Sequence, residues 1–147
     1  MRVVLDTNIL VSALMSRDNA CRRILRMAFE GNLEPLVGNA LFCEYEAVLK
    51  RDELFDGRCP FDEDRRMAFL DDVASVCRWV EIRYLWRPNL RDEGDNHLME
   101  LAVAGQARAI VTQNIRDFRR TELLMPEIDI LHPLQVLEGG EKKQWRH

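Results

Sequence analysis

The residues of this chain whose types and spacing could do chemistry are a set of scattered acids. Each lies where a strand is expected to end or a helix is expected to run: Asp6, Glu44, Asp92, Asp95 and Asp117. Carboxylates that converge repel one another unless a positive charge lies among them, and a hard divalent cation commonly fills that place. Bound Mg²⁺ or Mn²⁺ keeps several waters, one of which can become a nucleophile. The acids therefore indicate metal-dependent chemistry on phosphate.

The elements that must position these acids alternate between strand and helix. Short apolar runs predict strands at residues 2–5, 34–38, 79–82, 109–112 and 128–131. Apolar residues at helical spacing predict helices near residues 9–14, 19–30, 39–50, 61–78 and 95–105, with a last helical turn at 134–138. Such alternation is typical of a parallel sheet with helices on both faces. Right-handed crossovers place all the carboxyl ends of the strands on one rim, where the acids could meet.

Length and composition favour one globular domain. The 147 residues are 47% hydrophobic and 31% charged, and we expect a domain at residues 1–138 followed by a flexible tail at 139–147. No apolar run approaches the roughly 20 residues that cross a bilayer, and the first residues resemble a strand rather than a secretory signal. We therefore expect a cytoplasmic protein without a membrane partner. The net charge of −4 does not favour a general nucleic-acid binder, but it does not exclude a nuclease.

The four cysteines, Cys21, Cys43, Cys59 and Cys77, form no CxxC pair. A zinc site or a redox pair is therefore not expected from their spacing. In a cytoplasmic protein we expect reduced thiols, mostly buried as small apolar side chains.

Each acid also has a plain structural explanation. Asp6 could simply cap the helix that follows it, and one of Asp92 and Asp95 could do the same at a positive helix end. Asp95 lies nearer the body of that helix, so it is the better candidate for a ligand. Glu44 is the weakest member by spacing, because exposed helix glutamates are abundant. It gains weight because its helix follows the second strand and faces the same rim.

Four segments in order along the chain resemble the PIN-domain family. They are VVLDTN at 3–8, EYEAVL at 44–49, DEGD at 92–95 and VTQNIRDF at 111–118. The resemblance covers about residues 2–137 and is closest to toxin-like proteins of the VapC kind. It implies a three-layer α/β/α sandwich around a central parallel sheet of about five strands. It also implies a metal-dependent endoribonuclease, the toxin of a toxin–antitoxin pair.

The resemblance carries roles over to individual residues. Asp6, Glu44 and Asp95 match the three core acids of the family. Asp117 matches a frequent fourth acid, and Asp92 would be an auxiliary ligand. The polar supporting positions are matched by Asn8, Thr112 and Asn114. Many relatives have an aspartate where Asn114 stands, so a second metal site depends on whether Asp117 can turn inward.

The expected cofactor is Mg²⁺ or Mn²⁺, with Asp6 as the anchor and Glu44 and Asp95 as further ligands. Asn8 and Thr112 would orient ligands or water. The RNA backbone would be held by the basic residues that flank the site: Arg116, Arg119 and Arg120. The resemblance further implies an antitoxin partner and a homodimer.

Two other functions remain open at this point. An aspartyl-phosphate phosphohydrolase would also place an aspartate at the end of the first strand, but it needs a second acid two residues on, where this chain has Asn8. A catalytically silent PIN-like module that binds RNA or protein would keep the fold without cleaving. His97 is expected on the helix surface near the site rather than as a ligand.

Overall fold

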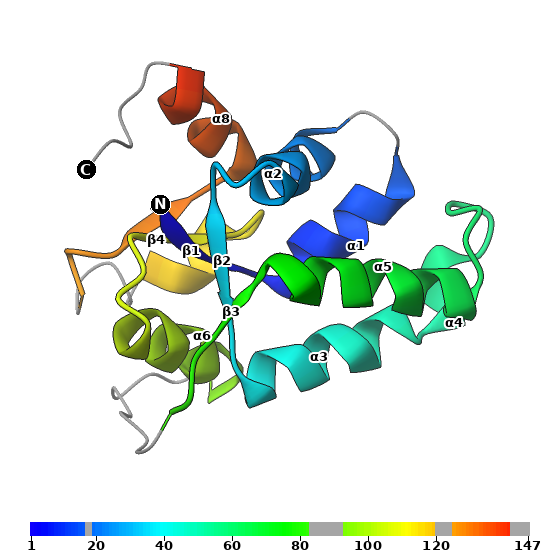
Figure 1. The fold of residues 1–147 in the computed structure, drawn as a ribbon, viewed down its shortest axis with the longest axis horizontal. Helices are drawn as coiled ribbons and strands as arrows, with labels where there is room; N and C mark the ends of the chain where they lie inside the picture. Colours follow the sequence, from blue (N-terminus) through cyan, green and yellow to red (C-terminus); the bar gives the residue numbers. More distant parts are fainter. Residues whose placement is uncertain (17–18, 83–92, 120–124, 142–147) are drawn as a thin grey trace.

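The computed structural model describes residues 1–16, 19–82, 93–119 and 125–141. Within these residues, five parallel strands form one sheet in the order β3-β2-β1-β4-β5 (Figure 1). The strands are β1 (Arg2–Leu5), β2 (Glu34–Val37), β3 (Arg78–Trp79), β4 (Ala109–Val111) and β5 (Asp129–Leu131). This arrangement confirms the parallel α/β sheet expected from the sequence.

The helices occupy the intervals between the strands. They are α1 (Thr7–Met15), α2 (Ala20–Phe29), α3 (Asn39–Leu49), α4 (Asp52–Phe55), α5 (Glu63–Val76), α6 (Glu93–Ala104), the 3-10 helix η1 (Ile115–Phe118) and α8 (Pro133–Glu141). Side-chain caps begin three of the described helices: Asp6 accepts from the backbone N–H of Thr7, Asn19 from that of Arg22, and Asp62 from that of Arg65. None of the described helices is long and apolar enough to cross a membrane.

Strands β1 and β4 lie side by side in the middle of the sheet. Val4 pairs with Leu36 of β2 on one side and with Ile110 of β4 on the other. From β1 the chain proceeds outward through β2 to β3, whereas from β4 it proceeds outward in the other direction to β5. The β1–β4 boundary is therefore a topological switch point, and ligands of such sheets bind at the carboxyl ends of the strands at that point.

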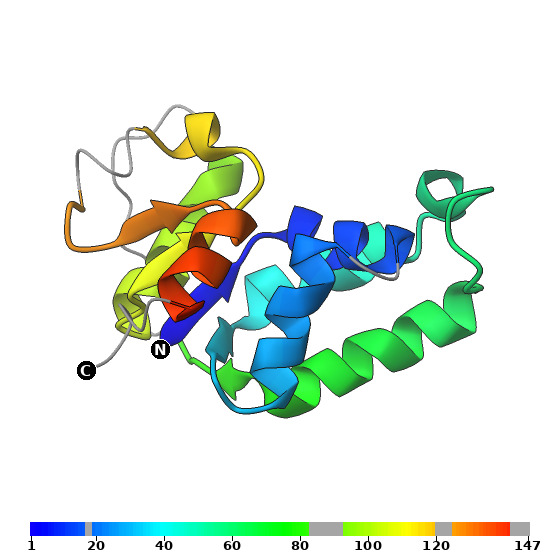
Figure 2. The same cartoon turned by 90° about the horizontal axis from the view of Figure 1, so that it is seen from above.

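The same reversal separates the helices into two layers. Helix α6 connects β3 to β4 and packs on β1, β2 and β4, whereas α2 packs against α1, α5 and α8. Right-handed crossovers in opposite directions require opposite faces of the sheet. Helices α3 and α5 lie side by side and extend together toward α4 in both views (Figures 1 and 2). The result is a three-layer α/β/α sandwich.

Three local expectations differ from the structure. The third strand is only two residues long, Arg78–Trp79, instead of residues 79–82. Helix α8 continues through two glycines to Glu141, beyond the expected end at 138, while residues 142–147 lie outside the described part. The cysteines are free, as expected, but they are not mostly buried: Cys21 is buried and Cys43 is exposed.

Candidate active site

Asp6 lies directly after β1 and is the N-cap of α1. Three donors hold its carboxylate. Oδ1 accepts from the backbone N–H of Thr7 at 2.7 Å, and Oδ2 accepts from the Thr112 hydroxyl at 2.8 Å and from Asn8 Nδ2 at 3.2 Å. Because both oxygens are engaged, the carboxylate has one fixed orientation at the switch point.

Thr112 follows β4 and brings the neighbouring strand end to Asp6. It is fully buried, and its backbone N–H donates to the carbonyl of Leu131 at 2.9 Å. The backbone N–H of Asn114 donates to the Thr112 hydroxyl oxygen at 3.0 Å, and Asn8 Nδ2 lies 3.4 Å from the same oxygen. Because the Thr112 hydroxyl oxygen accepts from these two donors, its own proton is directed to Asp6.

Glu44 reaches the same place from α3. The buried hydroxyl of Tyr45 donates to the carbonyl of Leu5 at 2.5 Å, which fixes α3 against the end of β1. One carboxylate oxygen of Glu44 accepts from the Thr7 hydroxyl, and the other lies 3.5 Å from Nε2 of His97 on α6. Thr7 therefore joins the two acids, because its backbone contacts Asp6 and its side chain contacts Glu44.

The two carboxylates have opposite pKa shifts. Burial raises the pKa of Asp6, the hydrogen bonds from Thr112 and Thr7 lower it, and the nearby charge of Glu44 raises it further. The hydrogen bond from His97 lowers the pKa of Glu44, against the effect of burial. Of the two acids, Asp6 is therefore the one whose negative charge is less stabilised by its surroundings. A cation beside it would stabilise that charge.

The donor set suits a hard cation in its chemistry but is incomplete among the described side chains. Asp6 and Glu44 supply carboxylate oxygens, which Mg²⁺ prefers. No three acidic, histidine or cysteine side chains in the described part gather closely enough to hold a metal ion by themselves. Asp95 lies in the first turn of α6, two residues before His97, but its side chain is outside the described residues, and so is the whole of Asp92.

The remaining predicted residues lie farther along the chain, beyond β4. Asp117 is exposed on η1, and no contact among the described residues joins its side chain to Asp6 or Glu44. Asn114 contributes its backbone N–H rather than its side chain. Arg116 and Arg119 are exposed at η1, and Arg120 is not described.

Two residues at the site were missed by sequence reasoning. Thr7 could have been identified from the sequence, because it lies between Asp6 and Asn8 at the end of a strand. His97 was expected on the helix surface near the site. It does lie near the site, but its side chain is only 21% exposed, and its contact with Glu44 was not expected. Its position on α6 gave no indication of which acid it would face.

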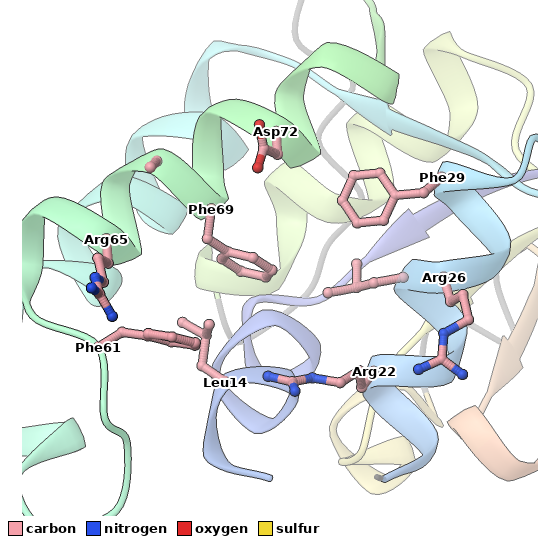
Figure 3. A pocket seen from close by; sticks show the side chains of 10 residues that line it. Leu14, Arg22, Arg26, Phe29, Phe61, Arg65, Phe69 and Asp72 are labelled. Atoms are coloured by element: carbon pink, nitrogen blue, oxygen red, sulfur yellow. The ribbon is translucent and has the colours of Figure 1, made fainter. Parts of the chain in front are cut away.

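An apolar groove between α1, α2 and α5 is a second feature (Figure 3). It measures about 450 Å³ and is lined by Leu14 of α1, Leu25 and Phe29 of α2, and Phe61 and Phe69 on the opposite side. Charged side chains border it: Arg22, Arg26, Arg65 and Asp72. We call this the α2–α5 groove.

The fold is similar to that of a solved protein. A chain in the crystal structure of VapBC2 from Rickettsia felis, bound to a DNA fragment from their promoter, matches with a TM-score of 0.59. The match has 18% sequence identity and covers 90% of the present chain and 98% of the other. No curated protein matches the chain significantly.

A family model described as PIN domain matches residues 2–116. This range contains Asp6, Glu44, Asp95 and Thr112, and it ends just before Asp117. The match spans most of the chain, and the observed sheet agrees with it. The chain therefore belongs to the PIN-domain family.

Proposed function

We propose that this PIN-domain protein is a metal-dependent endoribonuclease that hydrolyses phosphodiester bonds in RNA. The observation that carries the proposal is the pair Asp6 and Glu44, held together at the switch point by Thr7. Two acids kept close in a partly buried place resemble a cation site more than a structural cap. A cap alone would need only Asp6.

The proposed metal is Mg²⁺ or Mn²⁺, with Asp6, Glu44 and Asp95 as ligands and Asp92 or Asp117 as further candidates. When bound, such an ion supplies a water of lowered pKa that can attack phosphorus. The protein's own contribution is orientation, because Asn8, Thr112 and Thr7 hold the two carboxylates in place. Arg116 and Arg119 would contact the backbone phosphates on either side.

The test is cleavage of a panel of single-stranded and structured RNAs with Mg²⁺, with Mn²⁺ and with EDTA. We expect cutting by the wild type that requires the metal, and a loss of about a hundredfold or more in Asp6→Asn. Asp71→Asn, which neutralises an exposed acid on α5, is the matched control and should cleave normally. Full activity of Asp6→Asn would contradict the assignment. A folded protein that cuts none of the RNAs would favour a binding module.

We further propose that the protein is the toxin of a toxin–antitoxin pair and that the antitoxin covers the α2–α5 groove. The similar solved structure is named as VapBC2, a complex. The groove combines an apolar floor with three arginines and one aspartate at its border, so it suits a helix with an apolar stripe and acidic flanks. Expression of the chain alone should then arrest growth, and Asp6→Asn should relieve the arrest.

A further inference from the structure

A hollow beside the acid pair lies between the start of α3, the end of β3 and α6. Its volume of about 590 Å³ falls within the range of about 300–1,000 Å³ that small-molecule sites occupy. The lining combines apolar and polar side chains: Asn39, Ala40, Trp79, Val80, Glu81, Ile82, His97 and Glu100. We call it the α3–α6 pocket.

Nδ1 of His97 is fully buried without a hydrogen-bond partner among the described residues, and beside it in the pocket lies the acid Glu100. It is 6% exposed, yet no hydrogen bond or ion pair joins its side chain to another residue of the described part. Its oxygens are not fully enclosed, so this carboxylate is an acceptor that a ligand supplying N–H groups could use. Glu81, exposed on the same pocket, adds a second negative charge. Together they disfavour a phosphate inside the pocket and favour a neutral group rich in donors.

Trp79 gives the pocket an aromatic wall. Its side chain is half-exposed, and its ring lies 5.3 Å from that of Phe42 on α3, tilted by 45°. Phe42 therefore packs against the indole, about half of whose surface stays exposed. Aromatic rings presented in this way stack unpaired nucleobases.

His97 connects the pocket to the acid pair. Its Nε2 lies 3.5 Å from Glu44, and its ring lines the pocket. One imidazole ring thus separates the proposed cleavage site from the hollow. A nucleotide whose phosphate lies at Asp6 and Glu44 has its neighbouring base within reach of the pocket.

We propose that the α3–α6 pocket binds an unpaired guanine base of the RNA, next to the phosphate that is cleaved. The inference rests on the proposed nuclease function and extends it to base preference. Guanine alone among the four bases presents two adjacent donors, N1–H and the 2-amino group, which match the two oxygens of Glu100. Uracil places a carbonyl on each side of its single donor, so it would meet Glu100 with repulsion. Asn39 offers an amide for the guanine carbonyl.

The test measures binding without cleavage. Fluorescence anisotropy in EDTA compares the labelled RNAs UUGUU and UUUUU on the wild type, on Glu100→Gln and on the control Glu127→Gln, which changes an exposed acid outside the pocket. We expect the wild type to bind the guanine RNA at least fivefold more tightly, since one bidentate base contact discriminates by about 1–3 kcal/mol. The preference should fall below twofold in Glu100→Gln and persist in the control. Thermal unfolding checks that both variants fold.

Equal binding of the two RNAs by the wild type, or binding of neither, would overturn the pocket assignment. An unchanged preference in Glu100→Gln would overturn it as well. Stronger competition by butylguanidinium than by guanosine would show that the pocket takes a basic protein side chain instead. The two proposals fail separately: cleavage with Mg²⁺ but no guanine preference refutes only the pocket, whereas guanine preference without cleavage refutes only the nuclease.

Discussion

Asp6 is the residue at which function and stability oppose each other. Burial raises its pKa, with a further contribution from Glu44, so the charged form is disfavoured in the folded protein. A raised pKa means that the folded state binds the proton more tightly than the unfolded state. The stability that Asp6 contributes is therefore fully present below its unfolded pKa and is lost as the pH rises through its folded pKa.

The stability that Asp6 loses as the pH rises can be measured by replacing its carboxylate with a neutral amide. Without metal at pH 7, Asp6→Asn should unfold at the same or a higher temperature than the wild type, because asparagine mimics the neutral form. The difference should close as the pH falls below the usual aspartate range of about 3.9. Mg²⁺ should raise the unfolding temperature of the wild type but not of the variant. Differential scanning calorimetry from pH 3 to pH 8 measures all three effects.

A lower unfolding temperature of Asp6→Asn at every pH would contradict the prediction. It would mean that the hydrogen bonds from Thr112 and Asn8 outweigh the penalty of burial. Asp71→Asn is the control for the loss of one negative charge at the surface.

Individual site residues were predictable where a short polar segment follows an apolar strand. Asp6, Asn8 and Thr112 share this position, and the structure brings them into contact. The catalytic roles of these residues remain predictions. The contact between His97 and Glu44 could not be predicted, because it depends on how α6 and α3 are rotated against each other. No local pattern in either segment specifies that rotation.

Helix α3 positions Glu44 through its neighbour Tyr45. The Tyr45 hydroxyl is buried and donates to the Leu5 carbonyl at the end of β1, and burial raises its pKa well above the ordinary range. The bond joins the helix that carries one acid to the strand that carries the other. It therefore contributes both to the fold and to the spacing of the acid pair.

We predict that Tyr45→Phe leaves this carbonyl without a donor and costs about 1–3 kcal/mol of unfolding free energy. For a domain of this size the unfolding temperature should fall by roughly 2–4 °C for each kcal/mol. RNA cleavage at saturating substrate should also fall, because the helix that carries Glu44 loses its hydrogen bond to the end of β1. Urea unfolding and steady-state kinetics measure the two effects. Unchanged stability and unchanged turnover together would show that packing alone holds α3.

Most strands and helices could be predicted from the local spacing of apolar residues. The exceptions are caused by contacts with other elements. Residues 79–82 read as a strand, but β2 ends at Val37, which pairs with Trp79, so the ladder stops there. Gly139 and Gly140 read as the end of a helix, yet α8 continues to Glu141. Its packing against α2 and β5 overrides the low helix propensity of glycine.

The whole molecule carries a net charge of −4, but its positive charges are not evenly spread. Three arginines border the α2–α5 groove, whose floor is apolar, while the loop near α4 and the start of α5 is strongly acidic: Asp52, Asp56, Asp62, Glu63 and Asp64. An acidic partner would be attracted to the groove and repelled by that loop. The charge distribution therefore favours one orientation of the partner as well as one site.

The last prediction tests this complementarity with a defined probe. A 15-residue helical peptide with leucines at i, i+3, i+4 and i+7 and glutamates beside them should bind the groove, and the same peptide with lysines should bind about tenfold more weakly. Exposed charge pairs contribute up to about 1 kcal/mol each, and two such pairs account for that ratio.

Because Arg26 and Arg65 are exposed at the border, the charge reversal Arg26→Glu with Arg65→Glu should invert the preference. Raising the salt concentration should weaken the discrimination. RNA cleavage should stay unchanged in the reversed variant, because neither arginine contacts the acid pair. If both peptides bind the wild type equally, the arginines do not select the partner, and only the apolar floor remains as a basis for binding.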